Sequence, residues 1–277
     1  ISVNAAKNAY FGYMFGGLIK SIVCRIRPYE ISKGETDSVS DQVMSIMERA
    51  FEHGLDKEKA LSEALTLFSG IERDHDPKPK VGIFGDLYIR DNAIINQDLI
   101  RFIEAYGGEA VITPYYTYIK IIASSYFKKW FAEGKYMNLI SNRVIYSAMQ
   151  AMEKKYYKYF EPFLGDITVH QSKSSQEILA NYGILPEHTG ESMDNILKIH
   201  HIISEYPEMG LLVQTNPSFC CPALITEAMA SKIEEKTGIP IVTITYDISG
   251  GNKNRILIPY LDALVQKDYP QRRKASG

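Results

Sequence analysis

The chain reads Leu211-Leu212-Val213-Gln214-Thr215-Asn216-Pro217-Ser218-Phe219-Cys220-Cys221-Pro222 at the point that decides its fold. An apolar run ends in a short polar loop, and an amphipathic run follows from Ala223, an order typical of strand, loop and helix. In open α/β sheets such a loop lies at the carboxyl end of a strand, where ligands bind. Pro222 suits the first helical position, because its missing N–H would be unpaired there. Cys221 would then be the N-cap, at the positive end of the helix dipole, where a thiol is a better metal ligand or nucleophile.

Three further apolar runs have the length of buried strands. Together with the first they predict four parallel strands, at 81–85, 109–113, 210–214 and 240–245. We expect a Rossmann-like, doubly wound, mainly parallel α/β sheet, with right-handed connections. Its domain would span 80–268 and carry a large helical insertion at 115–205. Two other regions complete the expected organisation: a helical segment that ends an upstream domain or packs on the sheet, and a basic tail, at residues 1–76 and 269–277.

Composition excludes several classes of function. The chain has 277 residues, a formal net charge of −2 and 45% hydrophobic residues, as in ordinary globular proteins. Nucleic acid binding would need a basic face, and no apolar stretch approaches the ~20 residues that span a bilayer. We therefore expect a cytoplasmic protein with neither nucleic acid nor membrane as partner. The chain begins at Ile1 without a Met, inside an expected helix, so we expect a piece of a longer protein.

The chain has three cysteines, and two of them are adjacent. This number does not make a disulfide framework, so packing or chemistry in a reducing compartment is expected. Cys221 is the stronger candidate for ligation or catalysis, and Cys220 is expected to point into the core. Cys24 lies on an apolar helix, where packing is the expected role. Because there is no CxxC motif, a self-contained zinc site is not indicated.

Two other loops that follow strands carry polar candidates. In Gly85-Asp86-Leu87-Tyr88-Ile89-Arg90-Asp91-Asn92, Arg90 either meets an anionic ligand, with Asp86 or Asn92 shaping the loop, or forms a surface ion pair. The second loop is Tyr246-Asp247-Ile248-Ser249-Gly250-Gly251-Asn252. Its two glycines, which stand before a helix, allow backbone N–H groups to approach an anion. The cavity-lining candidates across the three loops are Asp86, Arg90, Asn92, Asn216, Ser218, Asp247, Ser249, Gly250, Gly251 and Asn252.

Several segments resemble one family. FCCPALITEAM (219–229) and TYDISGGNKNRILIPYL (245–261) resemble the end of the 2-hydroxyacyl-CoA dehydratase component family. RIRPYEISKGETD (25–37), KVGIFGDLYIRDN (80–92) and GGEAVITPYYTYIK (107–120) are similar to its large activase-related proteins, specifically to their carboxyl-terminal dehydratase-like region.

The resemblance implies a fold and an activity. In that family, stacked Rossmann-like domains hold an iron–sulfur cluster through cysteines at the carboxyl ends of strands. An ATP-driven activase passes one electron through the cluster to an acyl-CoA thioester, and water is eliminated. Phe219-Cys220-Cys221-Pro222 stands where the family has its last cluster cysteine, so Cys221 is the residue carried over, with Cys220 and Cys24 as weaker candidates. No obvious second ligand is present.

Two main hypotheses of function follow. The chain is either part of an iron–sulfur dehydratase system or a non-catalytic module that docks partners, and a small-anion-binding flavodoxin-like domain is a third reading. The resemblance implies a cluster in the full-length protein and none retained in the isolated piece. Implied partners are upstream domains of the same polypeptide, activase modules and an acyl-CoA substrate, and a homodimer is left open.

Overall fold

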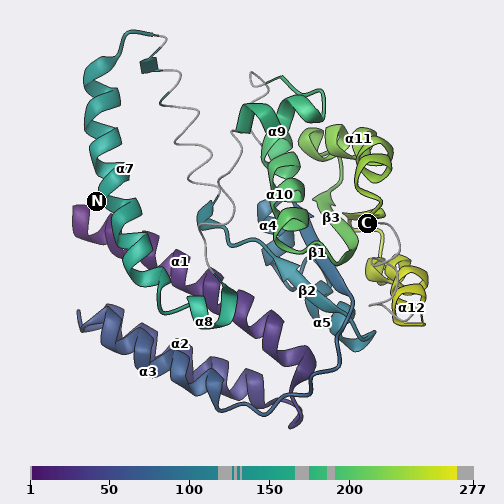
Figure 1. The fold of residues 1–277 in the computed structure, drawn as a ribbon, viewed down its shortest axis with the longest axis horizontal. Helices are drawn as coiled ribbons and strands as arrows, with labels where there is room; N and C mark the ends of the chain where they lie inside the picture. The colour runs from purple at the N-terminus through teal and green to yellow at the C-terminus, as the bar shows by residue number, and fades with distance from the viewer. Residues whose placement is uncertain are drawn as a thin grey trace. The chain divides into compact units, whose positions relative to one another are not determined.

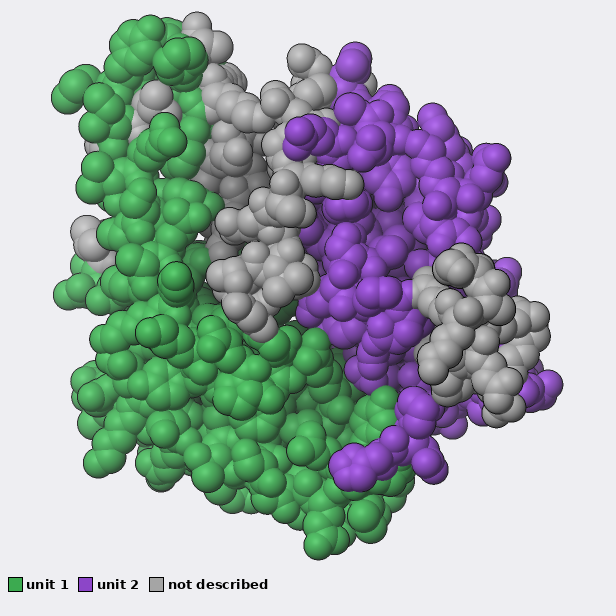
Figure 2. Space-filling view, in the orientation of Figure 1, with its two compact units in different colours: residues 1–74, 114–168 green, residues 75–113, 169–277 purple. Residues whose placement is uncertain are grey.

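A computed structural model describes residues 2–117, 127, 130–131, 133–165, 175–185 and 191–266. The expected tail at 269–277 and parts of the expected insertion lie outside these residues. Contacts divide the chain into two compact units, which Figure 2 shows in green and purple. Unit 1 comprises Ile1–Asp74 and Pro114–Thr168, and unit 2 comprises His75–Thr113 and Val169–Gly277.

This division differs from the expected one at the insertion. Residues 114–168 belong with the amino-terminal helices and not with the sheet, whereas 169–205 stay with the sheet. Aromatic packing explains the difference, because Tyr156 stacks edge-on against Phe11 and Phe15. A buried hydrogen bond from the Tyr10 hydroxyl to Glu153 joins the same two segments. Burial, and to a smaller extent the hydrogen bond to Glu153, raises the pKa of Tyr10 above its ordinary value.

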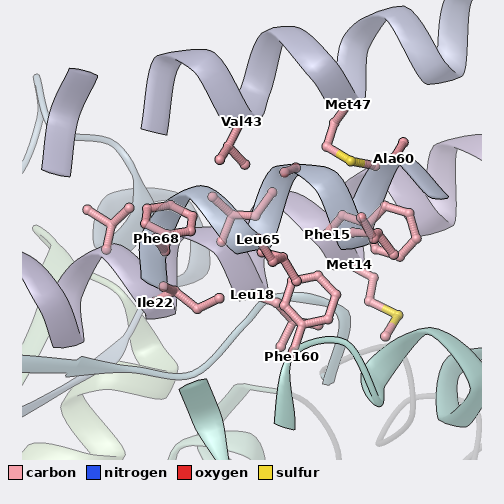
Figure 3. Close-up of a cluster of buried hydrophobic side chains, with 14 of the residues drawn as sticks. Met14, Phe15, Leu18, Ile22, Val43, Met47, Ala60, Leu65, Phe68 and Phe160 are labelled. Atoms are coloured by element: carbon pink, nitrogen blue, oxygen red, sulfur yellow. The ribbon is translucent and has the colours of Figure 1, made fainter. Parts of the chain in front are cut away.

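Unit 1 is built from helices. Its elements are α1 (Val3–Ile26), η1 (Arg27–Tyr29), α2 (Glu35–Glu52), α3 (Lys57–Ser69), α7 (Tyr136–Tyr157) and α8 (Glu161–Leu164). Figure 3 shows side chains from α1, α2 and α3 converging with Phe160 on one apolar core. Cys24 is buried, at 2% exposure, which agrees with a packing role. Helix α3 follows Asp56, whose carboxylate accepts hydrogen bonds from Glu58 and Lys59 N–H.

The start of α2 depends on Glu30. Its two carboxylate oxygens accept hydrogen bonds from Gly34 N–H and Thr36 N–H, each at 2.8 Å. Gly34 is the N-cap and Thr36 lies in the first turn of the helix, where a negative charge is favourable. Burial raises the pKa of Glu30, but the hydrogen bonds from Thr36 and Gly34 outweigh it, and the pKa lies below its ordinary value. Thr36 and Asp37 lie inside the helix, which begins at Glu35.

Unit 2 contains the predicted sheet. Its strands are β1 (Lys80–Gly85), β2 (Glu109–Ile112), β3 (Met209–Pro217) and β4 (Ile241–Tyr246). All pairings are parallel, and the strand order is β2-β1-β3-β4. Figure 1 labels β1, β2 and β3 among the helices of this unit. The expected Rossmann-like α/β fold is thus confirmed.

Helices connect these strands and follow the last of them. They are α4 (Leu87–Asp91), α5 (Leu99–Ala105), α9 (Ser175–Asn181), α10 (Glu191–Glu205), α11 (Cys221–Thr237), η3 (Lys253–Leu257) and α12 (Ile258–Gln266). From the central pair β1 and β3, one crossover runs outward to β2 and the other runs outward to β4. Right-handed crossovers in opposite directions put α5 and α11 on opposite faces of the sheet. Along the chain, α10 leads into β3, and it packs against β1, β3 and α11.

The central strands β1 and β3 are in close backbone contact at the end of β1. Asp86 N–H donates to the Thr215 carbonyl oxygen at 2.8 Å. Gly85 has φ +117°, and a Cβ at this residue would lie 2.2 Å from the same oxygen. Only glycine combines this backbone conformation with such a short approach. The sheet therefore requires Gly85.

We predict that Gly85→Ala destabilises unit 2 by at least ~3 kcal/mol, because it adds both backbone strain and a clash with Thr215. Gly250→Ala is the matched control. Gly250 also has positive φ, +71°, but no atom lies within 4 Å of its added Cβ. The control should cost only about 1–2 kcal/mol. Urea unfolding of both variants measures the difference, and equal costs would contradict the close approach.

We predict that Glu30→Gln destabilises unit 1 by ~1–3 kcal/mol at neutral pH, because the amide group removes one acceptor and the charge. Since the folded pKa of Glu30 is lowered, its contribution is complete above the unfolded pKa and disappears as pH falls through the folded pKa. The difference between variant and wild type in unfolding free energy should therefore shrink from pH 5 toward strong acid. The exposed Glu48→Gln is the control and should behave as wild type. A cost independent of pH would contradict the capping role.

Candidate functional site at the carboxyl edge of the sheet

The carboxyl ends of β1 and β3 form the topological switch point of the sheet. The chain leaves β1 toward β2 and leaves β3 toward β4, and β1 and β3 are hydrogen-bonded neighbours. In open α/β sheets, ligands bind in the crevice at this point. Two of the predicted segments begin here: Asp86 to Asn92 after β1, and Ser218 to Cys220 after β3.

The cysteine loop is shorter than predicted. β3 continues to Pro217, because Asn216 and Pro217 pair with Thr245 and Tyr246 of β4. Asn216, expected to line a cavity, is buried, and its Nδ2 donates to Thr245 Oγ1 at 3.0 Å. Ser218 is exposed.

The thiols occupy different positions from those predicted. Cys220 is the N-cap of α11 and Cys221 is its first residue, one place later than expected. Cys221 is exposed and Cys220 is half-buried. The preceding residue, Phe219, has φ +64° and is 93% exposed. A left-handed conformation is unusual for an aromatic residue, so the loop holds backbone strain beside the thiols.

The described residues contain no group of three or more His, Cys, Asp or Glu side chains arranged to hold a metal ion. Cys24 belongs to the other unit. Cys220 and Cys221 are therefore two adjacent donors at the start of a 17-residue helix. This donor set fits one corner of an iron–sulfur cluster and does not complete a cluster site.

The segment after β1 is a short helix, not the expected loop. Asp86 caps α4, since its Oδ1 accepts hydrogen bonds from Tyr88 N–H at 3.0 Å and Ile89 N–H at 2.8 Å. Asn92 Oδ1 accepts from Ile94 N–H and Ile95 N–H in the turn that follows. Asp86 and Asn92 therefore shape this segment, as expected.

Arg90 forms an ion pair, as one of the two alternatives from the sequence proposed, but the Arg90 side chain is buried and not at the surface. Its side chain is 0% exposed, whereas that of its partner Asp91 is 34% exposed. Arg90 Nη2 donates to Asp91 Oδ2 at 2.8 Å, and Nη1 donates to Thr113 Oγ1 at 3.1 Å. A second buried cation, Lys198, forms an ion pair with Asp194 one turn earlier on α10. Burial is the main cause that lowers the pKa of Lys198 to about 8, and the positive charge of Arg90 adds to it. The carboxylates of Asp194 and Asp91 act in the opposite direction.

The glycine loop after β4 is held by its own side chains. Asp247 Oδ1 accepts hydrogen bonds from Ser249 N–H and Ser249 Oγ, and lies 2.9 Å from Lys253 Nζ. These interactions, Ser249 first, hold the pKa of Asp247 well below its usual range. Gly250 and Gly251 both have positive φ, and Asn252 Oδ1 caps η3 through Asn254 N–H. The next element is a five-residue 3₁₀ turn rather than the expected continuous helix.

Sequence reasoning missed the amide side chains that tie two of these loops together. Gln97 donates to the Gly251 carbonyl oxygen at 2.9 Å and accepts from Lys253 N–H at 2.6 Å. Asn254, which is buried, donates to the carbonyl oxygens of Asn96 and Gln97 and accepts from the Tyr246 hydroxyl. No local sequence pattern indicated these contacts, because their partners are about 150 residues apart. The Lys253 N–H, which follows the two glycines, is thus already bonded within the chain.

Comparisons with protein-family models, with curated proteins and with solved structures find no match to this chain. The class of protein is therefore defined by the fold: an α/β protein with a four-stranded, all-parallel, Rossmann-like sheet. In the part of the chain that the structure describes, no helix has both the length and the apolar character needed to cross a membrane.

Proposed function

We propose that unit 2 supplies the Cys221 thiolate to an iron–sulfur cluster in a system related to the 2-hydroxyacyl-CoA dehydratases. One observation carries the proposal: an exposed thiol stands at the first residue of a 17-residue helix, at the carboxyl end of a central strand. The partial positive charge of the helix end favours an anionic thiolate and the negative charge of a thiolate-bound cluster. When bound, such a cluster supplies one-electron reduction of an acyl-CoA thioester.

The chain's own residues have defined roles in this proposal. Cys221 is the ligand, and Cys220 is its half-buried neighbour at the N-cap. The remaining ligands come from groups outside the described residues: an upstream domain of the same polypeptide, an activase module or a second copy of the chain. Because such clusters and free thiols persist in reducing compartments, the proposal includes a cytoplasmic location.

A docking role is the second candidate, and a specific observation favours it. Several large apolar side chains on the loops and helices at this edge are exposed, namely Tyr88, Ile94, Phe219, Leu224, Ile225 and Ile248. Exposed apolar side chains of this size are common at protein interfaces. In this reading a partner covers the edge and the cysteines bind no metal.

Iron content separates the two candidates. We predict that the full-length protein, purified without oxygen, contains iron and acid-labile sulfide, and that Cys221→Ser lowers both by at least about half, because loss of one thiolate ligand weakens cluster binding. Cys24→Ser is the matched control and should keep its iron, since Cys24 is buried in unit 1. Far-ultraviolet circular dichroism checks that both variants are folded.

Two results would contradict cluster ligation. One is an unchanged iron content in Cys221→Ser, and the other is equal loss in Cys221→Ser and in Cys24→Ser. A wild-type protein that contains no iron, yet retains a partner through the edge that includes Phe219, would support the docking role instead.

A further inference from the structure

The guanidinium of Arg90 uses only part of its hydrogen-bonding capacity. An arginine binds a planar oxyanion best through two parallel N–H groups, and Nε with Nη2 forms one such pair. In this structure Nη2 donates to Asp91, whereas Nε is buried and has no hydrogen-bond partner among the described residues. Asp91 thus bonds to one of the two N–H groups of this pair, and the other is unused. Leaving a buried donor unsatisfied costs free energy, so a ligand that reaches both groups gains by satisfying it.

Positive charge gathers around this half-filled pair. Arg90 and Lys198 are both almost fully buried, at 1% and 3% exposure, and they are close enough for Arg90 to oppose the charge on Lys198. The carboxylates that face them are Asp194, which is fully buried, and Asp91, which is one-third exposed. Asp91 is therefore the member of this group that can leave for solvent.

We propose that Arg90 binds a small oxyanion, a carboxylate or a phosphate group, in the position that the Asp91 carboxylate now half occupies. The incoming group accepts hydrogen bonds from Nε and Nη2 together, and the Asp91 side chain turns outward to water. Nη1 keeps its bond to Thr113, which follows the carboxyl end of β2 and fixes the plane of the guanidinium. Lys198 adds a second positive charge, and Asp194 holds Lys198 in place. The bound group replaces a group of the protein, so no preformed cavity is needed.

This site is independent of the cysteines. Its residues come from α4, α10 and the end of β2, not from the loop after β3. It also differs from the anion site expected at Gly250 and Gly251, where Lys253 N–H is already bonded to Gln97. Anion binding at Arg90 therefore does not depend on cluster binding by Cys221.

Titration of the full chain with inorganic phosphate, and separately with acetate, tests the proposal. Ionic strength is held constant with chloride, because exposed charges are screened by salt. The readout is the Nε–H resonance of Arg90 in a ¹H–¹⁵N spectrum, assigned by its disappearance in Arg90→Lys. We expect a saturable shift with at least one anion, and the stronger of the two identifies the preferred group. Asp91→Asn should increase the affinity roughly tenfold, because the competing carboxylate is removed.

Arg49→Lys, at an exposed arginine of unit 1, should leave the titration unchanged. Arg90→Lys keeps the charge and loses the two-point geometry, so saturable binding to the chain, followed for this variant by isothermal titration calorimetry, should be lost. Absence of a saturable Arg90 shift in Asp91→Asn with both anions would overturn the proposal. Unchanged affinity in Asp91→Asn would do the same, and this variant remains informative if Arg90→Lys fails to fold.

Discussion

The close approach of β1 and β3 at Gly85 is the constraint on which the functional edge of this protein depends. The hydrogen bond from Asp86 N–H to the Thr215 carbonyl oxygen joins the two strands where they end, and a side chain at residue 85 would prevent it. The same residue, Asp86, then caps α4 and so directs Arg90 into the interior. On the other strand, the chain passes from Thr215 through two more paired residues to the cysteine loop. One backbone contact thus positions both candidate sites.

Polar side chains, and not apolar packing, connect the elements at this edge of the sheet. Apolar strands fill the centre of the sheet, whereas amides and charged groups connect the elements at its carboxyl end. Gln97 and Asn254 join the loops that follow β1 and β4, and Asn195 donates to Thr226 on α11. Buried networks of this kind fix a unique arrangement when their groups are satisfied and leave a cost where they are not. The unsatisfied Nε of Arg90 is such a cost, and bound anion would remove it.

The sequence predicted those features that depend on local pattern. The four strands follow from apolar runs bounded by glycine, proline and polar residues. β3 gains its last residues by pairing with β4, which no local signal reveals, and α11 begins at Cys221, one residue before the predicted start. The burial of Arg90 depends on packing beneath α4, and its cationic neighbour Lys198 is more than 100 residues away in the chain. The division into two units likewise depends on distant aromatic residues, such as Tyr156 against Phe11.

Native-state hydrogen exchange at Asp86 N–H tests most directly whether the contact between β1 and β3 holds the carboxyl edge together. We expect this amide to exchange only when unit 2 unfolds, with the same protection as core amides of β3 such as Val213. That protection would show that the edge and the core of the sheet open as one unit. Exchange of the Asp86 amide through a local opening, much faster than that of the Val213 amide, would contradict the claim that the contact between β1 and β3 holds the carboxyl edge together.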